Sequence, residues 1–136
     1  MWIGDAQRVA VENLESYAPE LLLPIFAELP IARTLDVGHL WKQRRDPLPL
    51  LDAWLPHIRV IHLHGVREET GKRVDHVSLA AMTPDRIREM ETLLALLTEW
   101  QGVLTLEVFE QDYFSSREVL DAALVRVRKS SVDRVD

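Results

Sequence analysis

Four short apolar segments recur along the chain, and a longer stretch of helical pattern follows each of them. The segments cover residues 8–13, 32–37, 58–64 and 103–108. Each is rich in Val, Ile, Leu or Thr and largely apolar, which is typical of parallel strands buried on both faces. The pattern therefore predicts four β-strands with helices between them.

The expected helices have recognisable beginnings and ends. The first covers about 19–29, with Pro24 as a kink or break, and the second covers about 49–55. The third has Thr83 as its N-cap and Pro84 at its first position, and it ends before Gly102.

The last helix is expected to begin near Ser115, whose spacing to Glu118 fits a capping box. Residues 130–136 are predicted to form a polar tail that frays.

Strand and helix alternate four times, which predicts an α/β fold with a parallel sheet and right-handed crossovers. The chain has 136 residues, enough for one domain over 1–136. A complete TIM (β/α)8 barrel needs about 250 residues. Four βα units form either an open sheet or a (βα)4 half of such a barrel.

Every predicted strand ends in a side chain that can bind a metal: Glu12, Asp36, His62 with His64, and Glu107. Functional groups of parallel α/β folds gather at the carboxyl ends of the strands. A single carboxylate there can simply cap a helix, but a ligand at the end of all four strands indicates a shared site.

Two motifs extend this site. Gly38 lets the chain turn after Asp36, so that His39 can fold back over the site. His39 could also be a loop or helix-capping histidine without a role in the site. His62 and His64 alternate with Leu63 and share one face of their strand, and either can be the ligand.

The segment from Gly65 to His76 is polar and is expected to be an active-site loop. Asp75 and His76 could bind a second metal, and Arg67 or Arg73 could hold a phosphate or carboxylate. An ordinary solvated loop is the alternative for the arginines.

Composition narrows the chemistry. The chain has no cysteine, so a metal must be held by His, Asp and Glu, a donor set that favours transition metals, with Zn²⁺ and Mn²⁺ foremost. The net charge of -6 argues against a nucleic-acid partner. No signal peptide or membrane span is evident, so a cytoplasmic protein is expected.

At these residues the chain resembles the xylose-isomerase-like TIM-barrel superfamily, which includes sugar phosphate isomerases and epimerases and the endonuclease IV group. The resemblance implies that the chain corresponds to strands five to eight of that barrel. It also implies that Glu12, Asp36, His62 and Glu107 bind the principal metal, with His39 and His76 binding further metal or substrate.

Within the superfamily, His-Leu-His-Gly-Val (62–66) and Asp-His-Val-Ser-Leu (75–79) look most like the cobamide-remodelling phosphodiesterases. That likeness implies metal-dependent cleavage of a cobamide nucleotide loop, with Glu12 and Glu107 as catalytic residues and His39, His64, Arg67 and Arg73 binding the substrate.

Two other functions remain open. The first is a sugar isomerase or epimerase, in which Glu12 and Glu107 move a proton beside a carbonyl. The second is a non-catalytic half-barrel or fragment that binds a ligand or partner. An open half-barrel exposes two sheet edges, so we expect a homodimer or a separate N-terminal half-barrel as partner.

Overall fold

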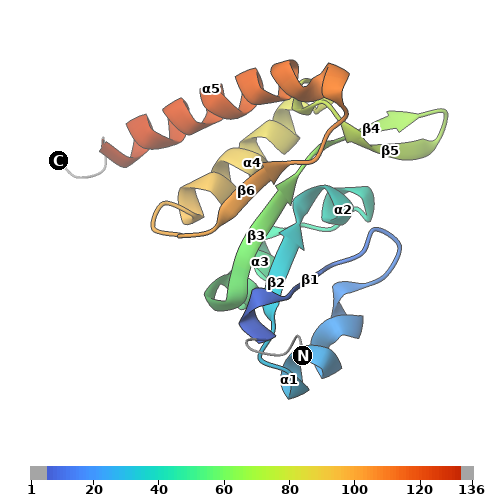
Figure 1. Ribbon diagram of the computed structural model, residues 1–136. Helices are drawn as coiled ribbons and strands as arrows, with labels where there is room; N and C mark the ends of the chain where they lie inside the picture. Colours follow the sequence, from blue (N-terminus) through green and yellow to red (C-terminus); the bar gives the residue numbers. More distant parts are fainter. Residues whose placement is uncertain (1–5, 133–136) are drawn as a thin grey trace. The chain divides into compact units, whose positions relative to one another are not determined.

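The computed structural model describes residues 6–132, and these form two compact units (Figure 1). The first unit reaches to Leu63 and includes Gln101–Thr105. The second comprises His64–Trp100 and the chain from Leu106 onward. The expectation of a single folding domain stays a prediction.

A parallel sheet organises the first unit and confirms the predicted α/β fold, which is compatible with half a barrel. Glu12 is aligned with Thr34, and Asp36 is aligned with His62, so neighbouring strands bring their carboxyl ends to one edge. The strand order is β1 (Ala10–Glu12), β2 (Ala32–Asp36), β3 (Ile58–Leu63) and β6 (Val103–Leu106).

The helical segments of the first unit are short. They are η1 (Ala6–Arg8), η2 (Pro19–Leu22), α1 (Leu23–Glu28), α2 (Val37–Lys42), α3 (Leu48–Trp54) and η3 (Leu55–His57). Pro24 lies in the first turn of α1, where the chain passes from a 3-10 turn into an α-helix, so the predicted break is confirmed. The sequence pattern did not predict α2.

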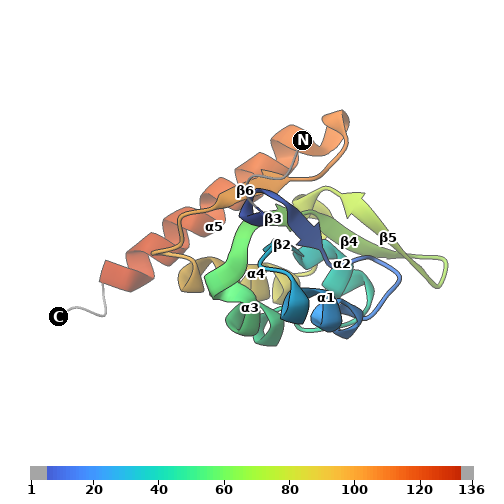
Figure 2. The ribbon, with the colours of Figure 1, turned by 60° about the horizontal axis from the view of Figure 1, so that its bottom comes forward.

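Helices α1 and α3 lie on the same side of the sheet (Figure 2). Phe26 of α1 meets Trp54 of α3 edge to face, with ring centroids 5.1 Å apart. The Arg33 guanidinium lies over the Phe26 ring, 4.5 Å from the ring centroid, and burial lowers the pKa of Arg33. Leu35 and Ile61 of the sheet are fully buried, so this side of the first unit is its core.

A β-hairpin begins the second unit where the sequence suggested a loop. β4 (Gly65–Glu69) pairs antiparallel with β5 (Lys72–Val77). Thr70 and Gly71 join the strands with φ of 45° and 79°, the left-handed values that two-residue hairpin turns need. The sequence pattern predicts an active-site or solvated loop here because both strands are rich in charged residues and lack an alternation of apolar and polar positions.

Two helices and two short turns complete the second unit: η4 (Leu79–Ala81), α4 (Pro84–Leu96), η5 (Glu110–Asp112) and α5 (Tyr113–Val132). Thr83 caps α4 as predicted, because its side chain accepts a hydrogen bond from the Arg86 amide. Helix α5 begins at Tyr113, so the predicted start near Ser115 is two residues late.

Ser115 does not cap α5. Its hydroxyl donates to the Asp112 carbonyl and bonds the Ser78 hydroxyl at 2.6 Å, which ties the start of the helix to η4. Ser130 and Ser131 are helical and donate to the carbonyls of Arg126 and Val127. Helix α5 therefore extends to Val132, residues 133–136 lie outside the described part, and the fraying of a polar tail over 130–136 stays a prediction.

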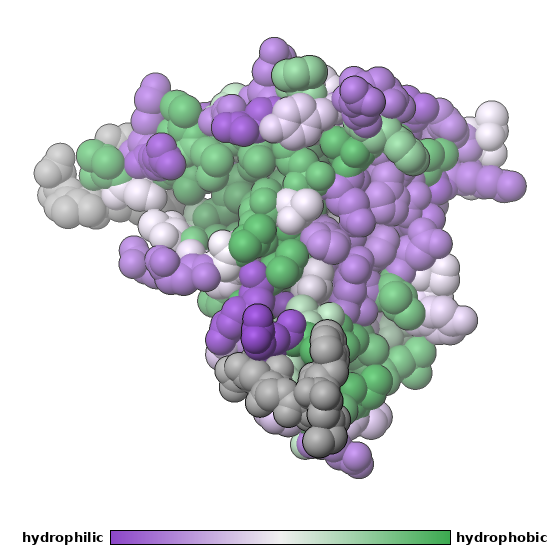
Figure 3. All heavy atoms as spheres, viewed as in Figure 1, coloured by the Kyte–Doolittle hydropathy of each residue, from purple (hydrophilic) through white to green (hydrophobic). Residues whose placement is uncertain are grey.

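Exposed apolar side chains gather on the connection from β1 to α1 in the first unit, where green atoms dominate the lower right of Figure 3. They line an open hollow formed by Leu14, Tyr17, Ala18, Leu21 and Leu22. Among residues 6–132, no helix is both long and apolar enough to cross a membrane.

Candidate metal centre

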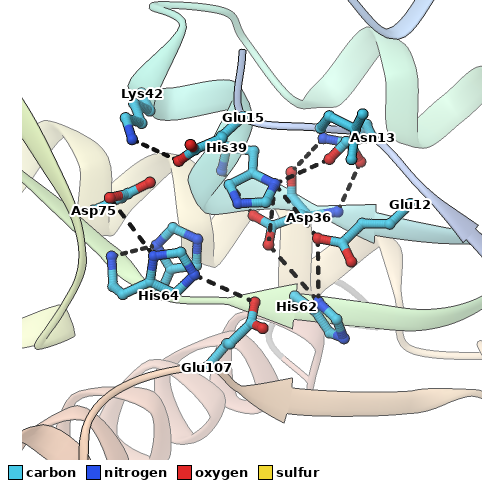
Figure 4. A network of polar contacts seen from close by, with 12 residues as sticks. Glu12, Asn13, Glu15, Asp36, His39, Lys42, His62, His64, Asp75 and Glu107 are labelled. Carbon is cyan, nitrogen blue, oxygen red and sulfur yellow. Dashed lines mark hydrogen bonds and ion pairs between the residues drawn. The ribbon is translucent and has the colours of Figure 1, made fainter. Parts of the chain in front are cut away.

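The carboxyl ends of β1, β2 and β3 carry three potential metal ligands in the first unit. Glu12 ends β1, Asp36 ends β2, and His62 is the last but one residue of β3. Each offers one ligand atom, and these three atoms lie within 4.8 Å of one another. The sequence-based expectation that these three side chains meet is confirmed (Figure 4).

The separations between these ligand atoms suit a shared cation better than direct hydrogen bonds. His62 Nδ1 lies 3.6 Å from Glu12 Oε1 and 3.8 Å from Asp36 Oδ2. Both distances exceed the roughly 2.7–3.2 Å of an ordinary N–H···O bond. Nitrogen and oxygen ligands about 2.0–2.2 Å from a tetrahedral zinc ion are about 3.4 Å apart. The donor set and its spacing therefore fit a divalent transition metal.

The two oxygens of Asp36 have separate roles. Oδ1 accepts the main-chain N–H of His39 at 2.7 Å and caps α2. Oδ2 faces the imidazoles of His39 at 3.5 Å and His62 at 3.8 Å. The Asp36 side chain is fully buried, and an ionised carboxylate is costly to bury unless cations or hydrogen-bond donors surround it. The capping role therefore coexists with a ligand role.

His39 folds back toward the strand ends, as its position after Asp36 and Gly38 predicted. Its Nδ1 lies 3.4 Å from Glu12 Oε1 and 3.0 Å from the main-chain oxygen of Asn13. A carbonyl oxygen can only accept, so Nδ1 donates to it and a neutral ring keeps its lone pair on Nε2. His39 can then bind a metal or a substrate through Nε2.

Asn13 is a buried residue that the sequence analysis did not single out. Its side-chain amide donates to the Asp36 carbonyl at 2.9 Å and accepts the Asp36 N–H at 2.8 Å. The side chain thus pairs with Asp36 as a strand residue would. Together with its contact to His39, Asn13 orients two of the candidate ligands. The sequence signal was only an amide directly after the strand-ending Glu12.

A second polar cluster lies within the second unit. His76 Nε2 is 3.7 Å from Glu107 Oε2, and its Nδ1 is 3.6 Å from Asp75 Oδ1. The His64 ring stacks on the His76 ring, with centroids 4.1 Å apart and planes inclined by 13°. The structure therefore brings Asp75, His76 and Glu107 together around one imidazole.

The two arginines expected to hold an anion lie on the hairpin and already have acidic partners. Arg67 pairs with Glu69 on the same strand, and Arg73 Nε donates to Glu68 Oε1 at 2.5 Å across the hairpin. Arg73 has the less exposed side chain, at 21% against 50% for Arg67. Either arginine must exchange its carboxylate partner to bind a phosphate.

Comparison of the chain with protein-family models, with curated proteins and with solved structures gave no match. The clusters of His, Asp and Glu therefore rest on their own geometry as candidate metal-binding groups.

Proposed function

We propose that the protein is a divalent-metal-dependent phosphodiesterase whose principal metal is held by Glu12, Asp36 and His62. The observation that carries the proposal is the set of three ligand atoms within 4.8 Å of one another at neighbouring strand ends. Zn²⁺ and Mn²⁺ are the preferred ions because the set combines carboxylate oxygens with imidazole nitrogen. Such an ion, when bound, polarises a phosphoryl oxygen and lowers the pKa of water.

The chain's own residues would bind the substrate and move its protons. Glu12 has a side chain that is 30% exposed, whereas that of Asp36 is fully buried, so Glu12 is the ligand better placed to accept a proton. His39 presents Nε2 for a phosphate oxygen or a further metal. Arg73 would hold an anionic substrate once it leaves Glu68.

Two residues of the second unit extend this proposal. Glu107 directly follows β6 in the sequence, and its role as a fourth ligand and catalytic residue stays a prediction. His76 would bind further metal or substrate, which favours phosphoryl chemistry, because several metals can stabilise both the attacking and the leaving oxygen. The cobamide nucleotide loop is the proposed phosphodiester.

A cleavage assay with the purified chain and Mn²⁺ or Zn²⁺ tests the proposal. Bis(p-nitrophenyl) phosphate and a cobamide are the two substrates, and we expect cleavage that Asp36→Asn lowers at least a hundredfold. His57→Asn is the matched control, because His57 lies in η3 before β3 and is exposed. Cleavage of neither substrate by metal-loaded protein would overturn the phosphodiesterase assignment.

The same preparations test the rival function. A sugar isomerase or epimerase would use Glu12 and Glu107 as its acid and base, and His76 would have no necessary role. Conversion of ketoses, such as C3 epimerisation, with His76→Asn as active as the wild type, would favour this rival.

We propose that four further parallel strands complete the sheet of the first unit. Among residues 6–132, β1 and β6 are its two edge strands, and unpaired edges tend to pair with other strands. These strands would come either from a second copy of the chain or from a separate N-terminal half-barrel. Light scattering of the purified chain distinguishes the two, because a homodimer has twice the mass of the chain, whereas a chain that needs a separate half-barrel stays a monomer. A metal-free monomer without activity would favour a non-catalytic half-barrel.

A further inference from the structure

His64 lies fully buried at the point where the second unit begins, between β3 and β4. The sequence allowed either His62 or His64 to be the metal ligand of this region. His62 lies with Glu12 and Asp36 in the first unit. The neighbours of His64 give it a different role.

The main-chain N–H of His76 donates to His64 Nδ1 at 3.0 Å. A main-chain N–H can only donate, so His64 Nδ1 must offer its lone pair and carry no proton. The Gly65 oxygen lies 3.2 Å from the same nitrogen and would accept a hydrogen bond from it only in the opposite tautomer, so we assign the tautomer by the shorter bond from His76. In this tautomer a neutral ring carries its proton on Nε2.

His76 needs such support because its backbone is in the left-handed region, with φ of 54°. Few residues other than glycine adopt this conformation, although histidine is among the more tolerant. The bond to His64 fixes the His76 amide, and the stacked His64 ring lies parallel to the His76 ring at 4.1 Å. Both contacts hold the imidazole that faces Asp75 and Glu107.

Gly65 makes this arrangement possible. A Cβ atom added at Gly65 would lie 2.3 Å from the Ser78 oxygen and 2.8 Å from the Val77 oxygen. Only glycine lets β4 approach the end of β5 so closely, and that approach brings His64 beside His76.

We propose that His64 is a positioning residue: its Nδ1 and ring plane hold His76 in the left-handed conformation, so that the His76 imidazole faces Glu107. In the tautomer that this role requires, His64 would not itself be a metal ligand. The importance of His76 for catalysis rests on the proposed phosphodiesterase function, but the geometry at His64 does not.

Long-range ¹H–¹⁵N NMR of histidine-labelled protein tests the proposal directly. We expect His64 as the neutral Nε2–H form with Nδ1 accepting a hydrogen bond, unchanged by added Zn²⁺. Exposed His57 is the reference and should show the averaged signals of a solvated ring. An Nδ1–H form of His64, or a zinc-induced shift of its nitrogens, would overturn the proposal whether or not the protein is an enzyme.

Two variants test the consequence for His76. His64→Asn keeps an acceptor oxygen near the place of Nδ1, whereas His64→Leu removes it and keeps the site filled. We expect the Leu variant to shift the His76 amide resonance and to lower kcat for phosphodiester cleavage about ten- to a hundredfold, as loss of a ligand's supporting contacts typically does. The Asn variant should keep the His76 amide resonance near its wild-type position and should keep most of the wild-type kcat.

Each outcome has a separate meaning. Equal His76 shifts and equal kcat in the Leu and Asn variants would contradict the proposal, since only an acceptor-dependent role predicts a difference. If the wild type cleaves no phosphodiester, the proposed function fails, while the NMR comparison still decides the role of His64.

Discussion

Asp36 shows how one side chain meets two demands at a strand end. One oxygen caps α2 and the other faces His39 and His62. Sequence reasoning set capping and metal binding against each other as alternatives. The two carboxylate oxygens allow both, because the cap uses only Oδ1.

Residue identity and strand position predicted Glu12, Asp36, His39 and His62 as neighbours, since parallel strands end at one edge of a sheet. They did not predict Asn13. Its contribution comes from two hydrogen bonds to the main chain of Asp36, 23 residues away. Sequence pattern carries no information about a contact of that kind, because the main-chain partner has no distinguishing side chain.

Asn13→Ala should lower the affinity for Zn²⁺ about ten- to a hundredfold, because Asp36 loses the side-chain amide that pairs with its main chain, whereas the Asn13 carbonyl beside His39 is kept. Isothermal titration calorimetry measures the change. Gln43→Ala is the matched control: the Gln43 side-chain amide also donates two hydrogen bonds, to the oxygens of Leu14 and Tyr17, and the main-chain bond from Gln43 to the His39 carbonyl is kept in the variant. Equal affinities for the two variants would exclude a positioning role for Asn13.

At the scale of elements, the sequence predicted the four strands of the parallel sheet and helix α4 closely, but it did not predict the hairpin of β4 and β5. Thr83 and Pro84 mark the start of α4 by local chemistry, which sequence shows directly. The strands of the hairpin are held at the tip by charged pairs such as Arg73 with Glu68. A run of charged residues is also what a solvated loop contains, so the pattern alone does not distinguish the two.

Gly65→Ala should destabilise the second unit by about 1–3 kcal/mol, the usual cost of forcing atoms into a packed site. The added Cβ would meet main-chain oxygen rather than a movable side chain. Gly71→Ala, at φ of 79° with no atom within 4 Å of the added Cβ, should cost about 1 kcal/mol through backbone strain alone. Urea unfolding measures the free energy of unfolding of both variants. A smaller loss of stability for Gly65→Ala than for Gly71→Ala would show that β4 and β5 do not approach as described.

At the scale of the whole molecule, the sequence predicted four βα units as one half of a barrel. The four parallel strands agree with that prediction. The division into two compact units was not predicted, because the strand and helix pattern continues without a linker across Leu63 and His64. The break falls between two residues of one apolar segment, where composition does not change.

Zinc binding to the full chain, followed by calorimetry and by X-ray absorption at the zinc edge, tests the metal centre most directly. We expect nitrogen and oxygen ligands at about 2.0–2.2 Å with an imidazole signal. Asp36→Asn, which keeps the helix cap, should weaken binding at least tenfold, and His57→Asn should not. Zinc bound equally well by Asp36→Asn and the wild type would contradict a centre built on Glu12, Asp36 and His62.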